Sequence, residues 1–302
     1  AGVCHTDHQS LNWDGPLVLG HEGAGWVDAV GPDVSHLVIG QPVLLNWAIP
    51  CGHCVPCQQS HGHLCDRTQG LSKESPSVAS PHTEWQQQAI RRSFNLGTFS
   101  EYALVRSKAL TPLPAHLPMH EACILGCGVM TGVGSVINSA NVQAGESVVV
   151  LGCGGVGLSV IQGARIAGAK SIIALDKRIE SLERAKRMGA THTWRIEDND
   201  AKFEAAVAHV RSLTDERGAD YAFEATGQHS LAFAPLKFIR HGGVALQLSG
   251  AHGEVSASML DFWWDKRYLT PLYGGCHPPR DFPKLMRWID EGQLDVASMI
   301  TR

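Results

Sequence analysis

The chain has 302 residues, of which 44% are hydrophobic and 18% charged, and its formal net charge is −4. These proportions are typical of a globular protein of about two domains. The charge leaves no basic excess for a nucleic-acid backbone. No apolar run approaches the roughly 20 residues of a membrane span, and no signal peptide is visible. We therefore expect a cytoplasmic protein that binds neither nucleic acid nor membrane.

The first part of the chain predicts a compact all-β region. Residues 16–50 contain short apolar runs broken by glycine, which permits bends and close backbone approach. The polar stretch 66–97 predicts a surface excursion, either as a plain loop or with one short helix over 84–92. Residues 98–106 predict a strand, and 116–126 predict a helix with proline near its start.

From residue 147 the pattern becomes regular. Helices are predicted over 156–168, 179–190 and 204–218, and each has apolar residues at three-to-four spacing. Between and beyond them lie six predicted strands, at 147–152, 171–176, 191–196, 220–225, 244–249 and 268–273. This alternation indicates a parallel sheet covered on both faces, as in a doubly wound nucleotide-binding domain.

Four cysteines stand at short, fixed spacing: Cys51, Cys54, Cys57 and Cys65. Four thiolates can close a tetrahedron around one Zn2+ and leave no position for water, which indicates a structural zinc site. The alternatives are disulfides or chance clustering, but neighbouring cysteines on a tight loop are poor disulfide partners. Nine cysteines in a chain of this size are more typical of cytosolic metal chemistry than of secreted disulfides.

A glycine-rich turn follows the strand predicted at 147–152, and its sequence is Gly152-Cys153-Gly154-Gly155-Val156-Gly157. Such glycines permit a tight turn and let a pyrophosphate approach the start of the next helix. Asp176 ends the following strand, where a carboxylate binds the adenosine ribose and repels a 2′-phosphate, so NAD is favoured over NADP. Lys177 and Arg178 weaken this discrimination. The alternative is a glycine turn in a sheet that binds nothing.

Cys4, His21 and Cys127 form a second set of candidate metal ligands. Singly, a cysteine is more often a small buried residue and a histidine a satisfied polar one. Together, two thiolates and one imidazole leave one position of a tetrahedral zinc open to water or substrate. Asp7 and Glu22 are candidates for orienting these ligands, because a carboxylate can hold the other ring nitrogen of a ligand histidine.

These motifs occur in an order that resembles the zinc-dependent alcohol dehydrogenases of the medium-chain dehydrogenase/reductase superfamily. The resemblance covers nearly the whole chain and rests on GVCHTD, GHEGAG, the four-cysteine loop, TFSEYALV, LGCGVMTG, GCGGVG and ALD. Within the family, VLLNW and LGCGVMTG most resemble the branch that contains thiol-dependent formaldehyde dehydrogenases and enzymes that retain NAD.

The resemblance implies a role for each matched residue. Cys4, His21 and Cys127 would bind a catalytic zinc, and the four-cysteine loop a structural one. Thr6 occupies the position of the hydroxyl that takes the substrate proton, and His5 that of a basic residue facing the cofactor pyrophosphate. Many members end the proton relay with a histidine where this chain has Gln9, which cannot act as a base near neutral pH.

The resemblance further implies a GroES-like β-barrel domain over 1–128 and a Rossmann domain over 129–302. Because relatives have several dozen more residues at each end, we expect a fragment that lacks barrel strands at the front and a return segment at the tail. The expected activity is hydride transfer between NAD and an alcohol or aldehyde–thiol adduct, by a homodimer or homotetramer with two zinc ions per subunit. Alternatives are an NAD-binding relative without turnover and, less favoured, a zinc-ribbon-type binding module.

Overall fold

The computed structural model describes residues 1–13, 15–66, 83–200, 202–250 and 253–301. The chain divides into two compact units, of which the first comprises 1–128, 276–289 and 296–302 and the second 129–275 and 290–295. The predicted domain limits, 1–128 and 129–302, stay a prediction. The compact units differ from them because 276–289 and 296–302 group with the first unit.

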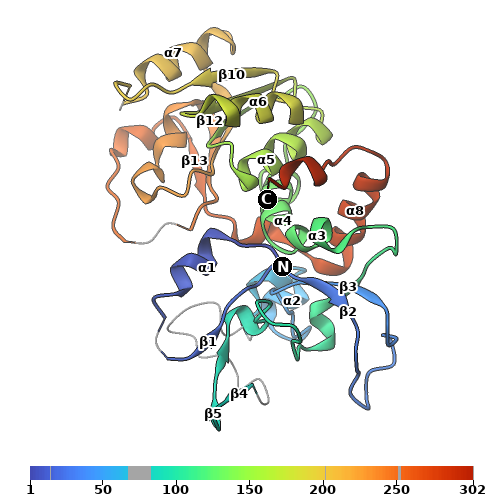
Figure 1. Cartoon of the computed structure of the whole chain (residues 1–302). Coiled ribbons are helices and arrows are strands. Elements are labelled where there is room, and N and C mark those ends of the chain that lie inside the picture. The colour runs from blue at the N-terminus through green and yellow to red at the C-terminus, as the bar shows by residue number, and fades with distance from the viewer. Residues whose placement is uncertain (14, 67–82, 201, 251–252, 302) are drawn as a thin grey trace. The chain divides into compact units, whose positions relative to one another are not determined.

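The first unit is built from short strands and helices (Figure 1). Its central sheet has the order β2 (Ala24–Trp26), β3 (Pro42–Leu45) and β7 (Leu110–Pro112), all antiparallel. Strand β1 (Leu17–Val18) pairs with β6 (Arg91–Arg92), and β4 (Glu84–Trp85) pairs with β5 (Gln88–Ala89). The helices are α1 (His5–Ser10), α2 (Val55–Gln58), α3 (Met119–Ala122) and most of α8 (Pro278–Asp290). Strand β3 is the central strand of this sheet, and its residues are almost fully buried.

Two local predictions for this unit are wrong. Residues 84–92 form neither a plain loop nor a short helix but contain strands β4, β5 and β6, because Gln86 and Gln87 both take positive φ and close a two-residue hairpin turn. Residues 98–106 form no strand among the described residues, and Tyr102 is 76% exposed. The helix expected over 116–126 is confirmed as α3 followed by a 3-10 turn, Cys123–Gly126. Residues 67–82 of the predicted excursion lie outside the described residues.

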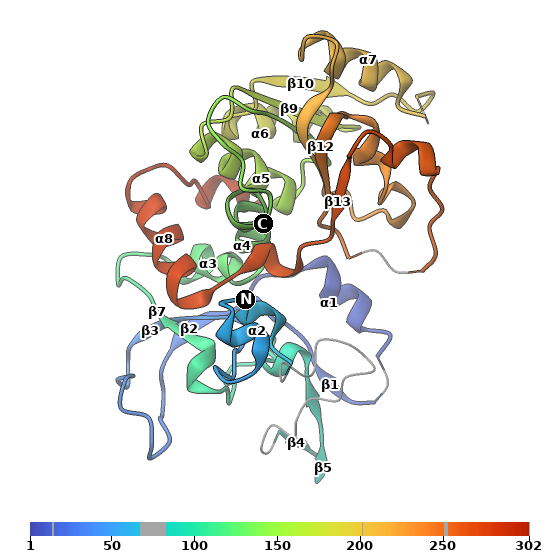
Figure 2. The same cartoon turned by 180° about the vertical axis from the view of Figure 1, so that it is seen from behind.

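The second unit contains a six-stranded parallel sheet with helices around it (Figures 1 and 2). Its strands are β8 (Ser147–Leu151), β9 (Ser171–Asp176), β10 (His192–Arg195), β11 (Ala219–Glu224), β12 (Ile239–Gln247) and β13 (Arg267–Leu269). The order β10-β9-β8-β11-β12-β13 is that of a doubly wound dinucleotide-binding sheet. The prediction of this sheet is therefore confirmed, and its topological switch point lies between β8 and β11.

The helices of this unit are α4 (Gly128–Gly134, whose first residue belongs to the first unit), α5 (Gly155–Ile166), α6 (Ile179–Met188) and α7 (Glu204–Ser212). Helices α5 and α6 pack beside each other, and both contact the sheet. The residues of β8 and β9 are nearly all buried, whichever way their side chains point, as in a parallel sheet that is covered on both faces. Their continuous Val, Ile and Leu runs follow from this burial.

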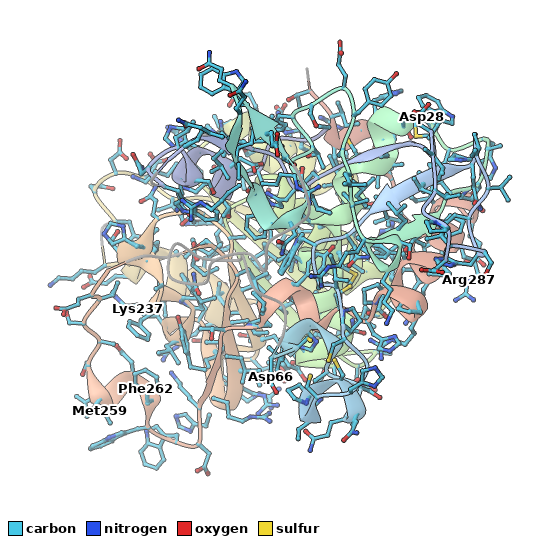
Figure 3. The ribbon with its side chains drawn as sticks, turned by 90° about the horizontal axis from the view of Figure 1, so that it is seen from below. Asp28, Asp66, Lys237, Met259, Phe262 and Arg287 are labelled. Carbon is cyan, nitrogen blue, oxygen red and sulfur yellow. The ribbon has the colours of Figure 1, made fainter. Side chains whose placement is uncertain are left out.

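The last predicted strand is shorter than expected. Only Arg267–Leu269 pairs with β12, and Leu272–Gly275 forms a 3-10 turn. Pro271 cannot donate a ladder hydrogen bond, and Tyr273 has positive φ. A segment rich in large apolar residues, Met259–Phe262, precedes this strand, and Figure 3 labels both of its end residues. Met259, Leu260, Trp263 and Trp264 are all exposed.

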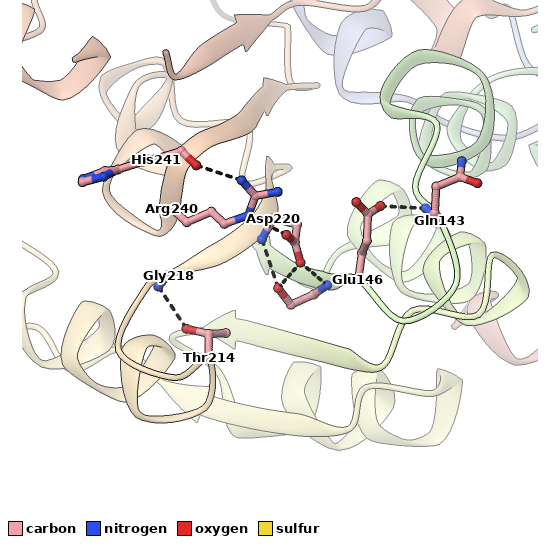
Figure 4. A network of polar contacts seen from close by, with 8 residues as sticks. Gln143, Glu146, Thr214, Gly218, Asp220, Arg240 and His241 are labelled. Carbon is pink, nitrogen blue, oxygen red and sulfur yellow. Dashed lines mark hydrogen bonds and ion pairs between the residues drawn. The ribbon is translucent and has the colours of Figure 1, made fainter. Parts of the chain in front are cut away.

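A polar network ties together the amino ends of the three central strands (Figure 4). One carboxylate oxygen of Asp220 accepts hydrogen bonds from the backbone N–H and hydroxyl of Ser147, at 2.8 and 2.6 Å. The other accepts from the guanidinium of Arg240 at 2.6 Å. Burial acts to raise the pKa of Asp220, but these hydrogen bonds hold it below its usual value.

In the described ranges, no single helix combines the length and apolar character needed to cross a membrane. One broken pair, Met119–Gly126 with Gly128–Ala140, meets the criterion by length and composition alone.

Candidate functional site

The structure brings Cys4, His21 and Cys127 together within the first unit. Their ligand atoms all lie within 4.8 Å of one another. Cys4 is the N-cap of α1, His21 follows β1, and Cys127 stands directly before α4. Two sulfurs and one ring nitrogen at this spacing fit three of the four ligand positions of a tetrahedral zinc, and no fourth ligand joins the group among the described residues. The sequence therefore identified a group that folding assembles from three distant segments.

The buried carboxylate of Asp7 organises this group. Asp7 is only 2% exposed, and its Oδ1 lies 2.8 Å from Nδ1 of His21. The same oxygen accepts from the backbone N–H of Gly20 at 3.2 Å, and Oδ2 accepts from that of Cys4 at 3.0 Å. Because Nδ1 of His21 is held by Asp7, Nε2 is the nitrogen left for a metal.

The electrostatics of the group favour a cation. A hydrogen bond between Cys127 and Cys4 lowers the pKa of the Cys4 thiol to about 4 and raises that of Cys127. Burial acts to lower the pKa of His21, but Asp7 and Cys4 outweigh it and raise the value to about 9. The Cys4 thiolate is thus stabilised in a largely buried group, and thiolates are the form in which cysteines bind Zn2+.

Glu22 lies beside the group. It is buried, and its Oε1 accepts a hydrogen bond from the backbone N–H of Gly128 at 3.1 Å. Burial, with the nearby Cys4 sulfur, raises its pKa to about 7. Glu22 also leaves no room for a side chain at position 2, because a Cβ on Gly2 would lie 2.1 Å from Oε2 of Glu22. The prediction that Glu22 supports the ligands remains a proposal.

Aromatic side chains around His21 were not singled out from the sequence. The ring centroid of Phe94 lies 4.3 Å from that of His21, and Trp13 and Trp47 lie 6.2 and 5.5 Å from Phe94. Phe94 has positive φ, a rare conformation for a bulky residue, which is found most often at functional sites. No sequence motif marks Phe94, so its contact with His21 could be found only from the fold.

The four-cysteine loop has the geometry of a closed zinc site. Its ligand atoms lie within 4.8 Å of one another. The Sγ atoms of Cys51 and Cys57 are 3.9 Å apart, and those of Cys54 and Cys65 are 3.8 Å apart. A tetrahedron with Zn–S bonds of about 2.3 Å has sulfur–sulfur edges of about 3.8 Å, whereas a disulfide requires about 2.05 Å. All nine cysteines lie in described residues, and none forms a disulfide.

Backbone N–H groups prepare this loop for a metal. The N–H groups of His53 and Cys54 each lie 3.4 Å from Sγ of Cys51 and lower its pKa to about 6. The N–H of Cys51 lies 3.3 Å from Sγ of Cys65. These donors stabilise thiolates, so the loop fits a structural zinc.

The glycine turn in the second unit has the shape that a pyrophosphate needs. Gly152 has φ of +91°, and a Cβ on Gly157 would lie 1.9 Å from the carbonyl oxygen of Gly152. Only glycine permits this tight contact between strand and helix. By contrast, a Cβ on Gly154 or Gly155 would meet nothing within 4 Å, so both positions face open space at the start of α5. Val156 is the second residue of that helix.

Asp176 ends β9 beside this turn. Its Oδ2 accepts from the backbone N–H of Cys153 at 2.8 Å, and its Oδ1 accepts from that of Arg178 at 2.9 Å. The carboxylate therefore braces the turn, and its role toward an adenosine ribose stays a prediction. Arg178 is the N-cap of α6 and is exposed.

The remaining predicted residues lie on α1 of the first unit. Thr6 is half-buried in the first turn, and its backbone N–H hydrogen-bonds to Cys4. His5 and His8 are exposed, with ring centroids 6.3 Å apart. The role of His5 toward a pyrophosphate stays a prediction, since the glycine turn belongs to the other unit.

A GroES-like domain with an open group of two cysteines and one histidine and with a closed four-cysteine loop, followed by a Rossmann domain, defines a zinc-binding dehydrogenase. Residues 1–115 match the alcohol dehydrogenase GroES-like domain, and residues 155–291 match the zinc-binding dehydrogenase domain. The chain belongs to the zinc-dependent alcohol dehydrogenases of the medium-chain dehydrogenase/reductase superfamily. This confirms the resemblance and the fold class predicted from sequence.

Several relatives are similar along nearly the whole chain. Over 99% of its length the chain is 33% identical to the S-(hydroxymethyl)glutathione dehydrogenase of Synechocystis sp. and 31% identical to the class-3 alcohol dehydrogenase of Cereibacter sphaeroides, and it covers 83% of each. The crystal structure of benzyl alcohol dehydrogenase from Acinetobacter calcoaceticus superposes with a TM-score of 0.85 at 29% identity, over 98% of this chain and 81% of that one. The residues described above fit zinc and NAD, the cofactors of this family.

We predict two zinc ions per chain in chemically different sites. Cys127→Ala should lower the zinc content from two to one and abolish turnover with the fold intact, because the open group loses a ligand. Cys57→Ala should lower thermal stability and solubility, because metal binding at a closed site contributes to folding. Elemental analysis with thermal denaturation measures both effects. One zinc in the wild type, together with full activity of Cys127→Ala, would contradict the assignment.

Proposed function

We propose that this protein is an NAD-dependent zinc alcohol dehydrogenase that oxidises a primary alcohol or an aldehyde–thiol adduct, and catalyses the reverse reaction. The observation that carries the proposal is the open Cys2His group, whose histidine is oriented by Asp7. It occurs in the same chain as a glycine turn suited to a dinucleotide. When bound, zinc supplies Lewis-acid polarisation of a substrate oxygen, and NAD accepts hydride.

The residues of the chain supply orientation and proton transfer. Asp7 keeps the proton on Nδ1 of His21, so that Nε2 faces the metal position. Cys4 and Cys127 provide the negative charge that balances the cation. Thr6 stands two residues from Cys4 in the same turn of α1, and its hydroxyl can accept one proton while donating another. Gln9 has no titrating group, so the proton passes to water or to a neighbouring histidine.

The names of the relatives support an aldehyde–thiol adduct as the substrate. Several are named S-(hydroxymethyl)glutathione dehydrogenase, and they cover nearly this whole chain at 33% identity. A substrate panel with simple alcohols and with formaldehyde, each with and without a low-molecular-weight thiol, tests the proposal. NAD reduction that needs formaldehyde and thiol together would assign the adduct. NAD binding without any turnover would favour the alternative of a non-enzymatic relative.

We predict that Thr6→Val lowers the rate of alcohol oxidation by about 100-fold, because valine keeps the shape and removes the relay. Binding of NAD should change little. Gln9→Ala, on the same helix, is the matched control and should be mild. Steady-state kinetics with a calorimetric titration of NAD separates the two effects. Wild-type turnover by Thr6→Val would move the start of the relay to His5 or His8.

We predict NAD rather than NADP as the working cofactor. Asp176→Gly should raise the ratio of NADP use to NAD use by about tenfold or more, since the carboxylate no longer repels a 2′-phosphate. Asp176→Asn distinguishes the effect of the negative charge from that of the hydrogen bonds to the turn. The amide loses the charge but keeps an oxygen that accepts from the N–H of Cys153 or Arg178. Equal kcat/KM for both cofactors in the wild type would overturn this assignment.

We also propose a cytoplasmic homo-oligomer, a homodimer or homotetramer, formed through the β13 edge of the sheet. The exposed apolar residues before β13 support it: Met259, Leu260, Trp263 and Trp264. An exposed edge strand beside such residues is normally covered. The partner proposed is a second copy, and Pro271 limits how far the edges can pair. Sedimentation at micromolar concentration should show an oligomer that Trp263→Ser dissociates, whereas a wild-type monomer would contradict the proposal.

A further inference from the structure

A buried carboxylate stands at the opposite end of β11 from the half-buried Asp220. Glu224 is the last residue of the strand, and its exposed fraction is 0%. Its Oε1 accepts hydrogen bonds from both the backbone N–H and the hydroxyl of Thr226, at 2.6 and 2.5 Å. Its Oε2 accepts from the hydroxyl of Ser249, which lies beyond the end of β12. One carboxylate thus holds the two loops that leave adjacent strands.

The loop after β12 is held in a second way. The side-chain amide of Gln247 donates to the hydroxyl of Ser249 at 3.1 Å and to its carbonyl oxygen. The backbone N–H of Leu248 donates to the carbonyl oxygen of Glu224 at 2.9 Å. Glu224, Thr226, Gln247 and Ser249 therefore form a closed polar cluster at the carboxyl ends of β11 and β12.

The same cluster touches the glycine turn. A Cβ on Gly152 would lie 2.8 Å from the carbonyl carbon of Ala225 and from the backbone nitrogen of Thr226. The peptide between Ala225 and Thr226, which Glu224 holds by a hydrogen bond, therefore packs directly against Gly152 of the glycine turn. Strands β8 and β11 flank the switch point of the sheet, and ligands of such sheets bind outside the carboxyl ends of the strands.

Burying a carboxylate is costly, and an apolar residue would anchor the strand in the core just as well. Glu224 instead directs both oxygens at the loops that border the dinucleotide site. We propose that Glu224 is a positioning residue that keeps the loops at 225–228 and 248–250 in the conformation that binds NAD. This rests on the proposed function, because it names a determinant of cofactor affinity in the same site.

Calorimetric titration of the zinc-loaded full chain with NADH tests the inference. Glu224→Ala should raise the Kd for NADH by about tenfold, the effect expected from losing hydrogen bonds to a charged group. Glu224→Gln should restore most of the affinity, because an amide keeps an acceptor for Thr226 and offers a donor to Ser249. In kinetics, the KM for NAD should rise with little change in kcat.

Asp220→Ala is the matched control, since it removes a hydrogen-bonded carboxylate from the other end of the same strand. It should lower the Tm and leave the Kd for NADH unchanged. An equal rise in Kd for Asp220→Ala and Glu224→Ala, or wild-type affinity in Glu224→Ala, would overturn the inference. If Glu224→Ala does not fold, Thr226→Val and Ser249→Ala take its place, and unchanged affinity in both overturns it. A wild type that binds no NADH refutes the proposed function itself.

Discussion

The carboxylate of Asp7 is the interaction on which the candidate active site depends. It accepts hydrogen bonds from Cys4, Gly20 and His21, which belong to two segments of the chain. Since it is buried, water cannot compensate for the loss of any of these bonds. The same carboxylate therefore fixes the start of α1, the position of the histidine loop and the tautomer of the histidine. Asp7 thereby also sets the turn in which both Cys4 and Thr6 lie.

The two sets of candidate metal ligands stabilise a thiolate through different interactions. In the four-cysteine loop, local backbone N–H groups stabilise Cys51 at the surface, so a short segment forms the site from its own residues. In the open group, Cys4 and Cys127 come from distant segments, and Cys127 and His21 stabilise the Cys4 thiolate while the pKa of Cys127 itself is raised. The first site is suited to stabilising the fold. The second is suited to chemistry, because its three ligands leave one position of a tetrahedral zinc for water or substrate.

Strand β11 carries a buried or half-buried carboxylate near each end, and the two have different consequences. Asp220 joins Ser147 and Arg240 across three strands at the amino end, so it stabilises the sheet. Glu224 holds the loops that leave β11 and β12 at the carboxyl end, next to the glycine turn. All strands of the sheet run parallel, so one of its ends is free for binding while the other can be closed by polar pairs.

The sequence by itself determined whatever depends on local spacing and periodicity. The cysteine loop, the glycine turn with its following helix, and the strands from 147 to 249 could all be read directly, because each is specified by neighbouring residues. The turn at Gln86 and Gln87, the loss of pairing after Leu269 and the missing strand at 98–106 could not, because hairpin closure and ladder pairing depend on partners elsewhere. Only the tertiary structure placed Phe94 on His21 and Glu224 between two loops. Packing and burial decide such contacts between segments that are distant in sequence. Contacts of this kind produce no repeating pattern in the sequence from which they could be predicted.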